Sequence, residues 1–290
     1  METSTPPEQR GTLIPSPLAT GGSGERFEQR VGAYALALLL VGATPPVLLD
    51  SRLVEVAFQT RRLGWETDDL LLVGEVTPGV HRKLAVQAKR TFTVAQSNED
   101  CCKTFRAMWR DFRAFDRFSP ESDRLAIATL HGTTALLGHF QTLLATARAA
   151  SSIDDFQARV RTNGMVSQIA RKQYETVRAI LLETEGHHVT DELIWRFLKA
   201  LVVLSLDLGT ATSHTEASIL SLLAHTAISA GDARVIARAS WLTLLDEAGR
   251  NGSRPETYAT KRSRRNFVKH TVPSLRQRVA RYRRWFSTGA

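Results

Sequence analysis

The segments WETDDLLLV, residues 65–73, and RKLAVQAKRTFTV, residues 82–94, decide the fold class of this chain of 290 residues. The first ends in four consecutive apolar residues after two aspartates, which is typical of a central strand. In the second, apolar and other residues alternate up to Gln87 and Lys89, the period expected of a strand. Pro78-Gly79 between them predicts a turn. Two neighbouring strands are therefore expected.

The flanking sequence predicts an α/β module. Phe27, Val31 and Leu38 lie at helical spacing and favour a helix from Ser23 to about Val41. Alternation around residues 54–59 predicts a strand with one buried face. After these come a helix that Ser97 could cap, with an aromatic stripe from Phe105 to Phe115, a strand over 125–130, and helices over 132–149, 152–162, 164–185, 190–207, 213–230 and 232–248. The expected fold class is α/β, with a mixed sheet flanked by helices and followed by an all-helical region.

Composition divides the chain into four expected parts. Residues 1–23, rich in Pro, Thr, Ser and Gly, predict a disordered leader, and 24–150 form the α/β core. Residues 151–250 form a helical extension, and 251–290 a basic segment with an amphipathic helix. This last part holds eleven of the 38 Lys and Arg residues and one of the 29 acids, so the basic surface is a C-terminal feature.

Several classes of protein are excluded or disfavoured. Cys101 and Cys102 are adjacent and are the only cysteines, which argues against a disulfide framework and favours a reducing, cytoplasmic location. The longest apolar stretch, 31–43, is too short to span a membrane. The sequence contains no GxxxxGK[ST] or GxGxxG nucleotide-binding loop and no zinc-ligand spacing.

Four polar side chains in the α/β module could carry chemistry. Gln87 and Lys89 lie two apart on one strand, so they project from the same face, roughly 7 Å apart. Asp69, with Asp68 beside it, opens the preceding strand, and Glu28, or Glu25 one turn earlier, lies on the first helix. Aspartate and a second oxygen ligand can hold Mg²⁺, which lowers the pKa of bound water, while a lysine stabilises developing negative charge. These are the parts that phosphodiester hydrolysis needs.

Three segments, GSGERFEQRVGAY (22–34) and the two quoted above, carry a resemblance to the PD-(D/E)xK nucleases in the variant with glutamine at the second acid. More closely, the chain resembles the double-stranded DNA endonuclease domain of CD-NTase-associated effectors and antiviral STAND NTPases. DRLAIATLHG (123–132) and LIWRFLKALVVLSLDL (193–208) extend the likeness to about residue 210.

The resemblance implies a restriction-endonuclease-like sheet and DNA cleavage that depends on Mg²⁺ or Mn²⁺. It implies that Asp69 and Gln87 are metal ligands, with Asp68 as the alternative aspartate, that Lys89 is the catalytic lysine, and that Glu28 is an accessory acid that could also reach the metal. An effector of prokaryotic antiphage defence is expected, partnered by double-stranded DNA and a separate STAND-type NTPase or nucleotide-signalling sensor. Activity as a homo-oligomer is expected, and a membrane partner is not.

The basic C-terminus supplies the expected DNA contacts. The candidate residues for phosphate binding are arginines of KRSRR (261–265) and LRQRVARYRRWF (275–286): Arg262, Arg264, Arg265, Arg276, Arg281 and Arg284. A helix packed on its own domain, or docking to an acidic partner, are the alternatives for this segment.

Other functions remain open on the sequence alone. A nuclease-like core could serve as a non-catalytic nucleic-acid-binding or adaptor subunit, or the same site could cleave RNA. In a purely helical interaction subunit, the polar strand residues would be structural.

Overall fold

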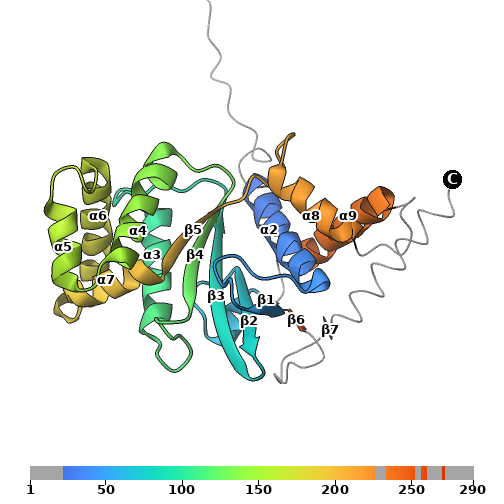
Figure 1. Ribbon diagram of the computed structural model, residues 1–290, viewed down its shortest axis with the longest axis horizontal. Helices are drawn as coiled ribbons and strands as arrows, with labels where there is room; N and C mark the ends of the chain where they lie inside the picture. Colours follow the sequence, from blue (N-terminus) through green and yellow to red (C-terminus); the bar gives the residue numbers. More distant parts are fainter. Residues whose placement is uncertain (1–21, 226–232, 252–255, 260–269, 272–290) are drawn as a thin grey trace, which may run out of the picture.

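The computed structural model describes residues 22–225, 233–251, 256–259 and 270–271. Within these residues the chain forms one mixed sheet with helices packed on both faces (Figure 1). The predicted fold class, a mixed α/β sheet flanked by helices with a helical region after it, is confirmed.

Seven strands form the sheet in the described part of the chain. β1 pairs antiparallel with β2 and β6, β2 pairs antiparallel with β3, and the β3/β4, β4/β5 and β6/β7 pairs are parallel. In spatial order the strands are β5 (Leu201–Ser205), β4 (Arg124–Thr129), β3 (Val80–Lys89), β2 (Leu70–Thr77), β1 (Arg52–Phe58), β6 (Thr257–Ala259) and β7 (His270–Thr271).

The described helices differ in type as well as length. η1 (Thr60–Leu63) and η3 (Gly186–His188) are 3-10 turns, and η2 (Thr134–Phe140) is a π-helix. The α-helices are α2 (Gly22–Val41), α3 (Glu99–Arg113), α4 (Gln141–Ala149), α5 (Ile153–Arg161), α6 (Gln168–Glu185), α7 (Asp191–Ala200), α8 (His214–Ala224) and α9 (Ala233–Asn251).

Two hydrophobic cores lie on opposite faces of the sheet. Helices α2, α8 and α9 cover one face, and α3 to α7 lie on the other (Figure 1). Side chains alternate between the cores along β3, with Leu84 and Val86 facing α2 and Ala85 facing α3. The prediction that the first strand has only one buried face is wrong: every residue of β1 except Arg52 is buried.

Several element boundaries differ from those that the sequence predicted. The helix expected over 190–207 ends at Ala200, and residues 201–205 form β5, because a short apolar run fits a covered strand as well as a helix. Helix α3 is capped by Asn98, not Ser97, and ends at Arg113. Phe115 therefore leaves the aromatic stripe, and 58% of its surface is exposed.

The expected division of the chain at about residue 150 stays a prediction. Residues on both sides of that point contribute strands to the same sheet, β5 beside β4 and β6 beside β1. The expected leader 1–23 lies almost wholly outside the described residues. No helix in the described chain is both long enough and apolar enough to cross a lipid bilayer.

Gly74 in β2 is required by a close approach. A Cβ there would collide with the hydroxyl of Ser51, which is held in place by donating to the Leu48 carbonyl at 2.8 Å. We expect Gly74→Ala to lower the free energy of unfolding by about 1–3 kcal/mol in urea titrations. Gly138→Ala is the control: its Cβ would meet only Thr134 at 3.5 Å, so equal losses would contradict the packing argument.

Candidate active site

The strand register brings Asp69 and Gln87 together. Leu70 pairs with Val86 across β2 and β3, so the preceding Asp69 lies opposite Gln87. The Gln87 side-chain amide donates to Asp69 Oδ2 at 2.6 Å, and the backbone N–H of Ala88 donates to the same oxygen at 2.6 Å. Both side chains are only 8% exposed. The two predicted metal ligands are therefore neighbours, at the edge of the sheet where β2 begins and β3 ends.

Burial dominates the acidity of Asp69. Loss of solvent raises the pKa of its carboxyl from 3.8 to about 6, and the charge of Asp68 pushes it in the same direction. The hydrogen bonds from Ala88 and Gln87 and the charge of Lys89 lower this pKa but do not offset the burial. Perturbed carboxyl groups of this kind are concentrated at functional sites.

Lys89 completes the predicted trio. It lies two residues after Gln87 on β3, on the same face of the sheet, and pairs with Thr129 at the end of β4. The positive charge of Lys89 lowers the pKa of the Asp69 carboxyl, against the larger effect of burial. Its half-buried side chain has no hydrogen-bond or ion-pair partner in the part of the chain that the structure describes. The ammonium group is thus available to a substrate.

Two oxygen atoms at this edge suit a hard cation. Asp69 Oδ1 and Gln87 Oε1 accept no hydrogen bond from the described residues, and carboxylate and amide oxygens are ligands that Mg²⁺ accepts. The described residues contain no group of three or more His, Cys, Asp or Glu side chains arranged to hold a metal ion. The donor set therefore fits a cation that keeps several waters, with a single carboxylate from Asp69.

Glu28 is connected to the site through a residue that the sequence did not single out, Gln59. The Gln59 side-chain amide donates to Glu28 Oε1 at 3.0 Å, and its backbone N–H donates to the Asp69 carbonyl at 3.1 Å. Gln59 also has a left-handed backbone, with φ 48° and ψ 60°, which is uncommon for a residue other than glycine. Nothing in its sequence context marks this conformation.

Asp68 is turned toward a different partner. Its carboxylate lies 3.5 Å from the Arg61 guanidinium, so it is occupied by a surface ion pair. Of the two adjacent aspartates, Asp69 alone meets Gln87. The roles of Asp68 and Glu28 as metal ligands stay predictions.

Asp111 on α3 anchors the loop that leads into Asp69. Its carboxylate accepts the backbone N–H groups of Glu66 at 2.9 Å and Thr67 at 2.6 Å. Asp111 is fully buried, and this burial raises the pKa of its carboxyl. No local pattern in the sequence indicates this contact, because the partners lie more than 40 residues apart.

The six arginines predicted to bind DNA, at positions 262, 264, 265, 276, 281 and 284, lie outside the described residues. Their role stays a prediction.

Comparison with known proteins gives a distant structural likeness. No family model matches the chain. No curated protein is significantly similar to it in sequence. A Cap4 SAVED/CARF-domain receptor from Moraxella osloensis matches with a TM-score of 0.40 and 15% identity over 81% of this chain. A Cap4 receptor from Acinetobacter baumannii, solved with a cyclic trinucleotide, matches with a TM-score of 0.42 and 10% identity over 89% of it. The chain spans 44% of the length of each receptor.

Removing the Asp111 anchor tests how the loop before Asp69 is held. Asp111→Ala leaves two backbone N–H groups without an acceptor, and we expect it to lower the free energy of unfolding by about 2–4 kcal/mol in urea titrations. Asp111→Asn keeps one carbonyl acceptor and should lose less. A loss of the same size in both variants would show that the two backbone bonds are not what stabilises this loop.

The raised pKa of Asp69 makes a second prediction, on stability against pH. The folded protein binds the Asp69 proton more tightly than the unfolded chain, so the associated stability is present below pH 3.8 and is lost as the pH rises through about 6. Asp69→Asn cannot ionise. We expect its free energy of unfolding, relative to wild type, to rise by up to about 3 kcal/mol between pH 4 and pH 7.5, measured by urea titration.

Asp155→Asn is the control for this titration. Hydrogen bonds from Arg159 and Ser151 lower the pKa of Asp155 to about 2, so its contribution is lost only as the pH falls toward that value. The stability difference between Asp155→Asn and wild type should stay level from pH 5 to 7.5. If the difference in unfolding free energy between Asp69→Asn and wild type is also constant from pH 5 to 7.5, burial does not disfavour the ionised form of the Asp69 carboxyl.

Proposed function

We propose that the chain is a metal-dependent endonuclease that hydrolyses phosphodiester bonds of double-stranded DNA. The observation that carries this proposal is the hydrogen bond between Asp69 and Gln87, with Lys89 on the same face, at the edge of the sheet where β2 begins and β3 ends. A buried acid with a raised pKa, beside an amide and a lysine that has no partner among the described residues, is the kind of group that is concentrated at functional sites.

Asp69 Oδ1 and Gln87 Oε1 are the protein atoms that would hold the cation. When bound, Mg²⁺ or Mn²⁺ supplies a water of lowered pKa and neutralises charge on the scissile phosphate. Binding requires the Asp69 carboxylate in its ionised form, and the charge of Lys89 favours that form. The hydrogen bond from Ala88 keeps the carboxylate in one orientation while a ligand arrives.

Lys89 and the arginines near it would contact the substrate. The Lys89 ammonium can donate hydrogen bonds to the attacking water or to a phosphate oxygen, where negative charge grows during hydrolysis. Arg90 follows it directly, and Arg62 lies on η1, in the connection that leads to Asp69. Both are exposed, and neither has an ion-pair partner within the described ranges of the chain. They are the phosphate contacts that we assign nearest to the site.

A role in prokaryotic antiphage defence is part of the same proposal, with a STAND-type NTPase or nucleotide-signalling sensor as the partner that triggers cleavage. This part is supported by the sequence resemblance in residues 22–34, 65–73 and 82–94.

One observation favours a second candidate, a non-catalytic nucleic-acid-binding module. The acids at positions 28, 68 and 69 do not form a three-carboxylate cluster, so the cation site has one carboxylate and little negative charge. Such a module would retain DNA without cutting it.

Plasmid cleavage separates these two candidates. We expect the full chain, with its activating partner where one is needed, to cut supercoiled plasmid in Mg²⁺ or Mn²⁺ but not in EDTA. Lys89→Ala and Asp69→Asn should reduce the cleavage rate by about 10²–10⁴-fold, because each removes a group that acts on the reacting atoms. Labelled RNA of the same sequence, run in parallel, tests the substrate.

Lys83→Ala is the matched control for Lys89→Ala. Lys83 lies on the same strand and the same face, but at the other end, where its ammonium donates to the Arg117 carbonyl. The Lys83→Ala variant should cut plasmid at the wild-type rate. Equal cutting by wild type and Lys89→Ala would reject Lys89 as a catalytic residue. DNA binding without cutting by any variant would reject the nuclease and favour the binding module.

A further inference from the structure

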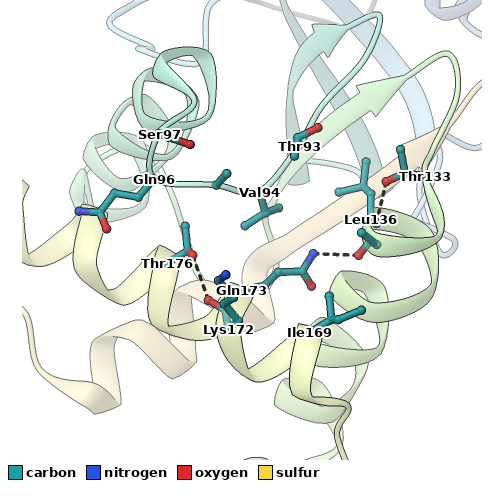
Figure 2. A pocket seen from close by; sticks show the side chains of 12 residues that line it. Thr93, Val94, Gln96, Ser97, Thr133, Leu136, Ile169, Lys172, Gln173 and Thr176 are labelled. Carbon is teal, nitrogen blue, oxygen red and sulfur yellow. Dashed lines mark hydrogen bonds between the residues drawn. The ribbon is translucent and has the colours of Figure 1, made fainter.

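A pocket opens beyond the strand ends that carry the site. It has a volume of about 460 Å³ and is lined by the loop between β3 and α3, the start of η2 and one side of α6 (Figure 2). Pockets of this size hold small organic ligands. Helix η2 is a π-helix, a form that is rare and frequent at functional sites.

Gln173 on α6 supplies an unpaired polar atom to this pocket. Its side-chain nitrogen donates to the Ala135 carbonyl at 2.8 Å, which fixes the amide orientation. Its oxygen Oε1 is buried and has no hydrogen-bond partner among the described residues. The residue as a whole is only 5% exposed. Figure 2 shows this amide in the pocket lining, with the nitrogen directed toward η2 and the oxygen on the side of Ile169. A buried acceptor without a donor is costly, so the position calls for a ligand N–H or O–H.

The rest of the lining fits a flat, partly apolar ligand that bears negative charge. Val94, Leu136 and Ile169 provide apolar surface against which a ring can pack. Lys172 is exposed at the pocket and has no ion-pair partner in the described chain, and no acidic side chain is among the lining residues. Every nucleobase carries an N–H group, an apolar ring face and, in a nucleotide, a phosphate.

The pocket is within reach of the site. Thr93 follows Lys89 by four residues, and Thr133 follows Thr129, the β4 partner of Lys89, by four residues. Four residues span at most about 14 Å, so the pocket lining begins no further than that from the paired strand ends. A DNA strand held at Lys89 can therefore extend a neighbouring nucleotide toward the pocket.

We infer that the pocket binds the base of a nucleotide, with Gln173 Oε1 accepting a base N–H and Lys172 contacting the phosphate. The base can belong to a DNA strand or to a free nucleotide. The DNA source rests on the proposed nuclease function, whereas the free nucleotide does not.

Photocrosslinking tests this inference without cleavage. The full chain, with Lys89 intact, is mixed in EDTA, which prevents cleavage, with duplex DNA in which 5-iododeoxyuridine replaces thymidine, or with 5-iododeoxyuridine monophosphate. After irradiation, the crosslinked peptides are identified by mass spectrometry. We expect crosslinks within residues 93–97 or 169–176 from at least one probe. Ala95→Phe, which fills the pocket from a loop and leaves the Gln173 bond intact, should reduce them at least about threefold, as should Gln173→Leu.

Lys172→Ala and Lys103→Ala form the matched pair, since each removes one exposed positive charge but Lys103 is already paired with Glu99 at 2.7 Å. Only Lys172→Ala should weaken crosslinking. Crosslinks from the free nucleotide alone support the pocket and remove the DNA source. Crosslinks that map elsewhere with both probes, or that persist in a folded Ala95→Phe variant, overturn the inference. Failure of the nuclease proposal is seen separately, as lack of plasmid cleavage by the chain with Lys89 intact.

Discussion

The two hydrogen bonds to Asp69 Oδ2 fix the geometry on which the site depends. They join the residue before β2 to the end of β3, so the acid, the amide and Lys89 are set by the strand register and not by a flexible loop. Sites built on strands hold their side chains more accurately than sites built on loops. The cost is a buried carboxylate, which the raised pKa of Asp69 records.

This arrangement requires a sheet that is covered on both faces. Helix α2 packs against the face that carries Leu84 and Val86, and α3 packs against the face that carries Ala85. Water is thereby excluded from the middle of β3, where the residues from Leu84 to Gln87 are buried, and the strand becomes partly exposed at Ala88 and Lys89. The transition from core to surface along β3 leaves Lys89 half-buried, two residues after the buried Gln87.

The sequence was informative where a pattern was local. The apolar run after the aspartates predicted β2, and the period-two alternation predicted β3. The expectation that Asp69 and Gln87 act together came from the family resemblance, and the strand register places them opposite each other. The sequence was uninformative for β5, because its apolar run is compatible with either a helix or a strand. The left-handed Gln59 and the Asp111 anchor were missed, since both depend on partners distant in the chain.

Glutamine at position 87 changes the electrostatics of the site in two opposing ways. A carboxylate there, at hydrogen-bond distance from Asp69, would repel it, and one of the two acids would stay protonated until a cation arrived. The amide donates a hydrogen bond instead, so the ionised Asp69 is tolerated without a metal. Glutamine in place of a carboxylate also removes one negative charge from the cation site. On the proposed function, the phosphate of the bound DNA must supply that charge, which makes cation and substrate bind together and keeps the site inactive until DNA is present.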